Sequence, residues 1–316
     1  MSIQSISVVI PTKGCVNKCE FCVSRMHDNP YENKFDQIQY RKRIKRAVIE
    51  RVPNLILTGT GEALQNKWFL KQLLEVLAKE NHPFPNVELQ TTGVMLADYK
   101  SRHVGEPFNY DVLDYENIEL LEKLGVNTIS LSVSDIFDSN NNWDIIGAPP
   151  KLRIDLDDLC KFIKQQGFNL RLSLNMTNAY ERIDPFHLYQ RCHELGADQI
   201  TLRKLYYPDE DPGMESSQTK WVKKNTLQPR EFKKFEEYIT GTPWKTVAGD
   251  SGFDHQKGKP LYRLPFGAMV YSYEGMSIAI DDNCMSKNNT DDLKYVILRE
   301  NGKLYCQWDD EGSLLF

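Results

Sequence analysis

Residues 5–22 read SISVVIPTKGCVNKCEFC and combine a strand pattern with a cysteine-rich loop. The first part of this stretch is a short aliphatic run, which is typical of a buried β-strand. The run leads into a loop with three cysteines at C-x3-C-x2-C spacing, namely Cys15, Cys19 and Cys22. A helical pattern follows the loop. This order predicts that the three thiols gather at the carboxyl end of the first strand.

The number of neighbouring cysteines narrows the kinds of metal site that the loop can form. A structural zinc site is closed by four protein ligands. Three cysteines around a [4Fe–4S] cluster instead leave one iron open to a substrate or cofactor. His27 would complete a closed zinc site, which is the alternative interpretation. The pattern favours an iron–sulfur cluster with an open position.

The remaining cysteines lie far from this loop and from each other. They are Cys160, Cys192, Cys284 and Cys306. Disulfide frameworks are typical of short, cysteine-dense, exported chains, whereas this chain has seven cysteines in 316 residues. Cys160 and Cys192 have apolar neighbours on predicted helices, as inert core cysteines do. We therefore expect reduced thiols.

Strand and helix patterns alternate regularly outward from this stretch. Strands are predicted at residues 5–11, 54–59, 86–92, 127–134, 169–176 and 198–204. Helices are predicted at residues 34–51, 67–79, 116–124, 156–166, 185–195 and 229–238. Strict alternation implies parallel strands with right-handed crossovers, and six units are too few for a closed eight-unit barrel. The prediction is an α/β fold, a partial (β/α)6 TIM-like barrel, with a doubly wound sheet as the alternative.

Two predicted connections are too long for simple turns, at residues 94–115 and 205–227. Both follow the carboxyl ends of strands, which is where active sites of such folds are built. They are candidate substrate-covering loops, and surface insertions are the alternative.

Residues 242–316 follow a different pattern from residues 1–241. Short alternating runs replace the helices there, and Asn301-Gly302 is a strong hairpin signal between two of them. We predict a core of residues 1–241 and a β-rich C-terminal extension that docks on the open side of the barrel as a substrate lid. Its expected apolar contacts are Tyr305, Trp308, Leu314, Leu315 and Phe316, and its polar groups for substrate are Asp281, Asp282 and Asn283. The alternative is a flap on the outside of the barrel.

The composition is that of a globular protein without a strong charge bias. Lys and Arg number 39 against 44 Asp and Glu, so the net charge is 39 − 44 = −5, which disfavours a dedicated duplex-DNA binder. A basic run at residues 40–46 fits the solvated face of a helix better than an RNA-binding patch. No window approaches the roughly 18 apolar residues of a membrane span. We expect a cytoplasmic, soluble protein with no membrane partner and no indicated nucleic-acid partner.

The cysteine loop and the end of the second predicted strand resemble the radical S-adenosylmethionine (SAM) superfamily. The loop has an aromatic residue, Phe21, before its last cysteine. The second strand ends in TGTGE, residues 58–62, which is similar to the Gly-Gly-Glu segment of that family. The third strand ends in QTTG, where the family often has Thr-Asn-Gly, so Thr92 departs from the pattern. The resemblance covers about residues 1–240.

This resemblance implies two cofactors, a [4Fe–4S] cluster and SAM. It implies that Cys15, Cys19 and Cys22 bind three irons, and that SAM chelates the fourth through its amino and carboxylate groups. A one-electron reductant such as flavodoxin or ferredoxin would then drive cleavage of SAM to a 5′-deoxyadenosyl radical, which abstracts hydrogen from a substrate. The substrate is a peptide, a nucleotide or RNA, or a small metabolite. A non-catalytic iron–sulfur or zinc protein is the alternative.

The resemblance further implies SAM-binding positions near the cysteine loop. The turn after the second strand consists of Gly59, Thr60, Gly61 and Glu62. Its glycines permit close approach of the backbone, and its carboxylate suits a cationic amine, so we expect it to hold the methionine moiety. Phe21 would pack beside the adenine, or simply in the core.

Polar residues at later strand ends complete the expected cofactor site. Ser132, Ser134 and Asn175 are short polar side chains suited to ribose hydroxyls or the SAM carboxylate, with strand-end capping as the alternative. Arg203 ends the sixth strand, and strand alternation permits it to point inward or outward. If it points inward, its fork can hold a carboxylate or phosphate of SAM or substrate.

The cysteines of the extension are the remaining candidates for chemistry. Some radical SAM enzymes use such tail cysteines for a second cluster or as hydrogen-atom donors. Cys284 and Cys306 are therefore candidate catalytic residues, although two ligands do not complete a four-cysteine site.

Overall fold

A parallel sheet forms the centre of the computed structural model, which describes residues 3–26, 34–96, 115–208, 213–241, 257–264, 268–281, 295–308 and 311–315. Its first strands are β1 (Ser5–Ile10), β2 (Asn54–Gly59), β3 (Asn86–Thr91), β4 (Thr128–Val133), β5 (Asn169–Asn175) and β6 (Gln199–Arg203). They pair in sequence order and in parallel. This confirms the predicted α/β fold with a partial TIM-like barrel.

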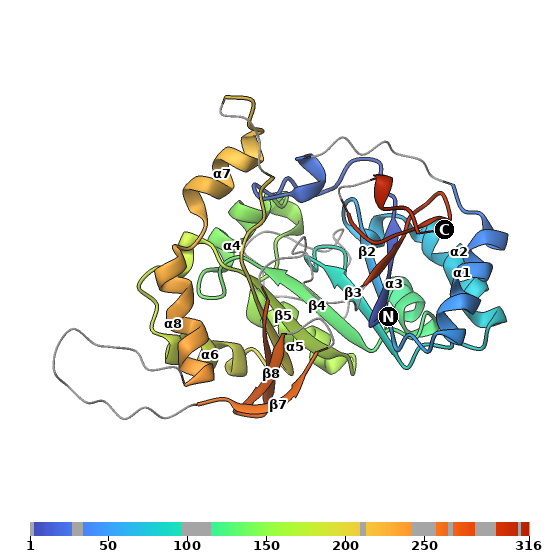
Figure 1. Ribbon diagram of the computed structural model, residues 1–316. Coiled ribbons are helices and arrows are strands. Elements are labelled where there is room, and N and C mark those ends of the chain that lie inside the picture. The colour runs from blue at the N-terminus through green and yellow to red at the C-terminus, as the bar shows by residue number, and fades with distance from the viewer. Residues whose placement is uncertain are drawn as a thin grey trace.

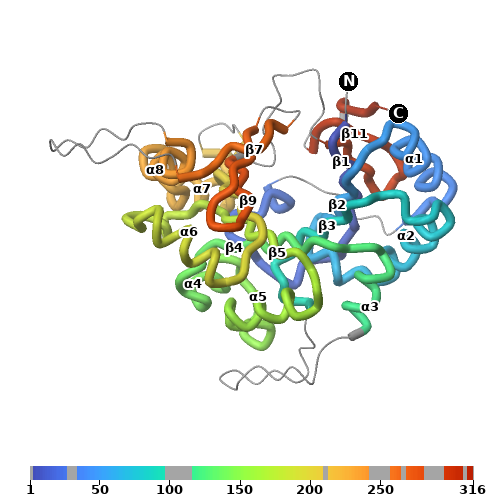
Figure 2. The backbone as a smooth tube through the Cα atoms, turned by 90° about the horizontal axis from the view of Figure 1, so that it is seen from below, coloured from blue at the N-terminus to red at the C-terminus, as the bar shows by residue number. Residues whose placement is uncertain are grey.

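Helices cover the outer face of the sheet, and Figure 2 shows α1 to α6 forming an arc around the strands. The helices are α1 (Gln37–Ile49), α2 (Lys67–Lys79), α3 (Tyr115–Lys123), α4 (Ser139–Ile146), α5 (Leu156–Gln165), α6 (Pro185–Glu194), α7 (Ser217–Asn225) and α8 (Pro229–Thr240). Successive strand residues point to opposite faces. On β1, Ile6, Val8 and Ile10 are fully buried in the core under the helices, and Ser5 and Ser7 face the barrel interior.

The C-terminal strands extend both edges of the six-stranded sheet. They are β7 (Lys259–Arg263), β8 (Met269–Tyr273), β9 (Met276–Asp281), β10 (Val296–Leu298) and β11 (Leu304–Tyr305). Strand β9 pairs in parallel with β6, and β10 pairs in parallel with β1. The β8–β9 and β10–β11 pairs are antiparallel hairpins, and the second turns at Asn301-Gly302 as predicted. The extension therefore contacts the barrel at its two open edges (Figure 1).

Two helices differ from the sequence-based expectation. Helix α4 lies between β4 and α5, and α7 lies within the predicted connection at residues 205–227. Both are short, and their sequences SNNNWDII and SQTKWVKKN are too polar to give a clear apolar period. The other long connection largely falls outside the described residues, which omit 97–114. Each of these helices begins after an N-cap residue, Asp138 for α4 and Ser216 for α7, whose side chain accepts hydrogen bonds from backbone N–H groups of the first turn.

The basic run on α1 lies on a solvated face. Arg41 and Lys45 both pair with Glu80, and Arg46 pairs with Glu50. These charges are therefore already paired with acidic side chains.

None of the helices in the described parts of the chain combines the length and the hydrophobicity that a bilayer crossing needs.

Candidate functional site

The cysteine loop lies at the carboxyl end of β1, as predicted. The backbone N–H of Cys22 donates to the carbonyl of Cys19 at 3.2 Å, and a short 3-10 helix, Val23–Arg25, follows. All three thiols are partly buried. Burial raises the pKa of the Cys15, Cys19 and Cys22 thiols, and the two neighbouring thiols raise the pKa of Cys19 further. A cationic metal centre would offset these penalties, because the thiolate is the ligand form of cysteine.

The turn after β2 packs against the base of this loop. The backbone N–H of Thr12 donates to Thr60 Oγ1 at 3.2 Å, and the N–H of Thr60 donates to the carbonyl of Ile10 at 3.4 Å. A Cβ atom at Gly61 would lie 3.1 Å from the Cβ atoms of both Cys15 and Thr12. A side chain at position 61 would therefore push Cys15 and Thr12 away, because the two loops approach closely.

Glu62 joins this turn to the end of β3. Its carboxylate is buried and accepts hydrogen bonds from Thr91 Oγ1 at 2.6 Å, from the Thr92 N–H at 3.1 Å and from Thr92 Oγ1 at 2.9 Å. Burial raises the pKa of Glu62, and these hydrogen bonds oppose the rise. Most acceptor positions of this carboxylate are therefore occupied by the protein itself.

Thr92 connects the same network to the cysteine loop. Its hydroxyl accepts a hydrogen bond from Asn17 Nδ2 at 2.9 Å while it donates to Glu62. The residue that departs from the family pattern is thus the bridge between Asn17, two positions after Cys15, and Glu62. Sequence reasoning missed this role because the contact joins residues 75 positions apart.

Helix α4 supports the cysteine loop from its other side. The backbone N–H of Lys18 donates to the carbonyl of Gly147 at 3.1 Å, and the N–H of Glu20 donates to the carbonyl of Ile145 at 3.1 Å. Gly147 has a φ of +63°, and a Cβ atom there would lie 2.6 Å from the carbonyl oxygen of Lys18. The glycine was not recognised in the sequence because α4 itself was not predicted.

We expect Gly147→Ala to lower the iron that the protein binds. Gly167→Ala is the matched control, because Gly167 also has a positive φ, +82°, but no atom lies within 4 Å of the added Cβ. Both variants bear a left-handed alanine, which costs about 1–2 kcal/mol. Only in Gly147→Ala does the added Cβ atom also push against Lys18 in the cysteine loop. Iron content after anaerobic reconstitution should fall in Gly147→Ala alone, and equal iron in both variants would contradict the assigned support.

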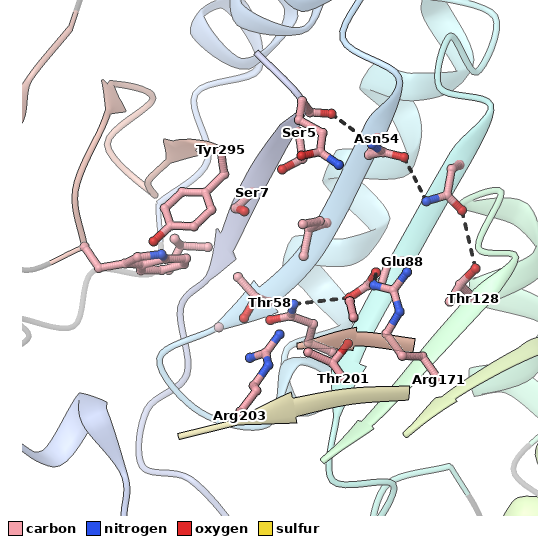
Figure 3. Close-up of a pocket in the computed structure, with 18 of the residues that line it drawn as sticks. Ser5, Ser7, Asn54, Thr58, Glu88, Thr128, Arg171, Thr201, Arg203 and Tyr295 are labelled. Carbon is pink, nitrogen blue, oxygen red and sulfur yellow. Dashed lines mark hydrogen bonds and ion pairs between the residues drawn. The ribbon is translucent and has the colours of Figure 1, made fainter. Parts of the chain in front are cut away.

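Two adjoining cavities open beside the loop. A cavity of about 410 Å³ is lined by Gly14, Cys15 and Cys22, among others. A second cavity of about 950 Å³ occupies the barrel interior (Figure 3). Ser24 and Thr60 line both of them. The site therefore has a compartment at the cysteines and a larger one next to it.

The predicted strand-end residues lie close together. Asn175 Nδ2 donates to Ser132 Oγ at 3.0 Å and to Ser134 Oγ at 3.4 Å. Ser134 and Asn175 are buried, and the described walls of the two cavities do not include any of the three. Their mutual hydrogen bonds are those of strand-end capping, and a contact with SAM stays a prediction.

The other candidate residues are placed as follows. Phe21 is partly buried, with its ring centroid 6.3 Å from that of Trp221 on α7, so it packs against the core. Arg203 points inward and lines the larger cavity. Cys306 is partly buried and its N–H donates to the carbonyl of Ser313 at 3.1 Å. Cys284 and His27 lie outside the described residues.

Some of the residues predicted to pack in the extension are buried, and one of them is exposed. Tyr305 is buried, Trp308 is half-buried, and Leu315 packs against the core. Leu314 was expected to pack but is 45% exposed. Its neighbour Leu315 points to the core instead, because the chain is extended here and adjacent side chains alternate. Phe316, Asp282, Asn283 and the side chain of Asp281 lie outside what the structure describes.

Comparison with known proteins gives one family. A model described as the radical SAM superfamily matches residues 9–177. A search among curated proteins finds no match. Native anSMEcpe with bound AdoMet and the Kp18Cys peptide is similar in structure, with 14% identity, a TM-score of 0.56, and coverage of 98% of this chain and 76% of that chain. This likeness supports the fold.

Two further solved structures are similar at lower TM-scores. SuiB of Streptococcus suis, bound to precursor peptide SuiA, has 17% identity and a TM-score of 0.46, with 96% of this chain and 59% of that chain covered. The coproporphyrinogen III oxidase HemN from Escherichia coli has 18% identity and a TM-score of 0.44, with 75% of this chain and 51% of that chain covered. The chain thus spans little more than half the length of these two proteins.

Proposed function

The chain belongs to the radical SAM superfamily, whose model matches residues 9–177 of its 316 residues, and we propose that it abstracts a hydrogen atom from a substrate. Membership makes it an enzyme with a [4Fe–4S] cluster and SAM as cofactors. When bound, the reduced cluster cleaves SAM and supplies a 5′-deoxyadenosyl radical. The protein contributes binding, orientation and the exclusion of water.

The cysteine loop has the donor set that such a cluster needs. Cys15, Cys19 and Cys22 supply three thiolates, and the two fixed neighbours of the loop, at Gly61 and Gly147, hold it in place. Thiolate sulfur is the usual protein ligand of iron–sulfur clusters. We assign one iron to each cysteine, which leaves one iron for SAM.

The turn from Gly59 to Glu62 is assigned to the methionine moiety of SAM. Thr60 lines the cysteine cavity, and a Cβ atom added at Gly61 would lie 3.1 Å from the Cβ atom of Cys15. The carboxylate of Glu62 is largely occupied by Thr91 and Thr92, so its main part is to fix the turn. The backbone of the turn, rather than this carboxylate, would then meet the cofactor.

The observation that carries the proposal is the contact between the two cavities. The smaller one contains Cys15 and Cys22, and the larger one lies inside the barrel. Because Ser24 and Thr60 line both, a group generated at the first cavity is next to a substrate in the second. This arrangement suits hydrogen abstraction across the boundary between the two cavities.

Product analysis tests the proposal. Anaerobically reconstituted protein is incubated with SAM and dithionite, which replaces a natural one-electron donor such as flavodoxin or ferredoxin. We expect 5′-deoxyadenosine to form, and to be absent when dithionite is omitted. Full iron loading with no 5′-deoxyadenosine would contradict the proposed chemistry.

The C-terminal extension is assigned as a lid over the larger cavity. Tyr295 and Trp308 line that cavity, with their ring centroids 6.2 Å apart, and β10 fixes this segment to β1. We treat residues 1–241 as the core and residues 242–316 as the extension.

Opening the lid should uncouple SAM cleavage from substrate. We expect deletion of residues 304–316 to leave cluster and SAM binding intact, to abolish substrate turnover and to raise the rate of 5′-deoxyadenosine formation without substrate. Since the deletion also removes β11, Trp308→Ala serves as a milder second variant. An unchanged rate in both variants would show that the extension does not cover the site.

A further inference from the structure

The interior of the barrel is polar along the length of its strands. A packed barrel fills its interior with branched aliphatic side chains. Here the inward positions carry hydroxyl and amide groups, including Ser7, Asn54, Asn86, Thr128, Gln199 and Thr201, all of which line the larger cavity. At about 950 Å³ this cavity is within the range of sites for small molecules. Asn86 Nδ2 donates to Asn54 Oδ1 at 3.0 Å and Thr128 Oγ1 donates to Asn86 Oδ1 at 3.4 Å, so these three groups bond to one another. We expect a ligand to meet the other polar positions of the wall.

One ion pair inside the cavity is complete. Glu88 pairs with Arg171, and its side chain is only 4% exposed. Gln90 Nε2 donates to Glu88 Oε1 at 3.2 Å, and Arg171 Nε donates to Gln199 Oε1 at 2.7 Å. Figure 3 shows Glu88 and Arg171 together on one wall of the cavity. Since both charges are compensated, this pair shapes the cavity without giving it a net charge.

Arg203 brings a positive charge into the cavity, whose wall also carries Arg299, Lys303 and Glu300. It ends β6 and points into the cavity, whose wall it shares with Thr58 (Figure 3). Its Nε atom is buried without a hydrogen-bond partner, and no acidic side chain in the described part of the chain forms an ion pair with it. A buried donor without a partner costs free energy. Its fork matches the two oxygens of a carboxylate or phosphate.

Arg203 lies away from the cavity at the cysteines. It lines the larger cavity, whereas the described wall of the smaller cavity at Cys15 and Cys22 does not include it. Tyr295 lies across the cavity from the Glu88–Arg171 pair in Figure 3. The T-shaped pair of Tyr295 and Trp308 presents aromatic surface to the same space. Such rings pack well against a flat ring of a ligand.

We propose that the substrate is a small molecule that carries a flat unsaturated ring and an anionic group, phosphate or carboxylate, and that Arg203 binds the anionic group. This inference rests on the proposed function, because it names the substrate of the same site. The volume of about 950 Å³ and the position of the cavity inside the barrel favour a whole small molecule over a segment of a long chain.

Two acids and their neutral counterparts test the proposal. The probes are uridine 5′-monophosphate against uridine, for phosphate, and 4-hydroxyphenylacetate against 2-(4-hydroxyphenyl)ethanol, for carboxylate. Each is titrated calorimetrically into anaerobically reconstituted protein with SAM bound. We expect at least one acid to bind about tenfold or more tightly than its neutral counterpart, since hydrogen bonds to charged groups are the strong ones. The preferred acid identifies the anionic group.

Variants locate the binding to Arg203. We expect Arg203→Gln to lower the affinity of the protein for the preferred acid about tenfold or more. Lys204→Gln is the matched control, because it removes the same charge from the next residue, which is exposed and lies over the Phe232 ring on α8. SAM affinity, iron content and the thermal midpoint should stay unchanged in both variants.

Three results would overturn the inference. They are equal binding of acids and neutral counterparts, equal effects of the two substitutions, and loss of SAM affinity in Arg203→Gln, which would place the residue in the cofactor site. Absence of binding by every probe would point to a peptide or RNA segment instead. Formation of 5′-deoxyadenosine in the same preparations separates these failures from a failure of the proposed function.

Discussion

Replacing any one of Cys15, Cys19 and Cys22 with alanine is expected to abolish cluster binding almost completely. Each thiolate holds one iron in the assigned site, and the loop offers no substitute ligand of the same kind. The loop is also fixed on both sides, so a distant thiol does not replace the lost one. Iron and sulfide content after anaerobic reconstitution, together with the brown absorbance, measure the effect.

The other buried cysteines provide the control. Cys160 on α5 and Cys192 on α6 lie in the core under the outer helices, and burial raises the pKa of both thiols, that of Cys160 to about 12. Their alanine variants should keep the full cluster, because neither thiol belongs to the cysteine loop or to the described wall of the cavity beside it. A full cluster in any variant of the loop cysteines would move the site elsewhere.

Gly61→Val is expected to have the second largest effect, on SAM binding and on the cluster together. The sequence alone predicts that SAM affinity falls while the cluster persists. The structure adds that the side chain would press on Cys15 and Thr12, whose Cβ atoms lie 3.1 Å from the new Cβ. Overpacking of this kind costs about 1–3 kcal/mol, so we expect SAM affinity to fall about tenfold or more and iron content to fall with it.

A graded series isolates the steric cause. Gly61→Ala adds one carbon, which small shifts of Cys15 and Thr12 can accommodate. Gly61→Val adds two further methyl groups on that Cβ atom. SAM affinity by calorimetry and iron content should decline from glycine to alanine to valine. Wild-type SAM affinity in the valine variant would mean that this turn does not meet the cofactor.

The fold was largely predictable because the strands have a clear pattern. The predicted ranges for β2 and α2 match the structure, and the predicted ends of the other strands among β1 to β6 match it to within one residue. The outward aliphatic residues of each strand carry this signal. Helices α4 and α7 were missed because their polar sequences lack it.

The site was predictable only where its residues are close in the sequence. Spacing within residues 15–22 identifies the three cysteines. The supports at Thr92 and Gly147 come from distant segments, and a single sequence does not show that either meets the loop. The direction of Arg203 was open because strand alternation needs a reference point, which the buried Leu202 on the helix side supplies.

Electron paramagnetic resonance of the reduced protein tests the central claim, that the three-cysteine loop holds a cluster with one iron open to SAM. Reconstituted protein with full iron content is reduced with dithionite and measured with and without SAM. Direct binding of SAM to the open iron should change the spectrum of the cluster, and Cys15→Ala, which lacks the cluster, should give no such signal. A spectrum that is identical with and without SAM would contradict the account, because the cluster would then be closed to the cofactor.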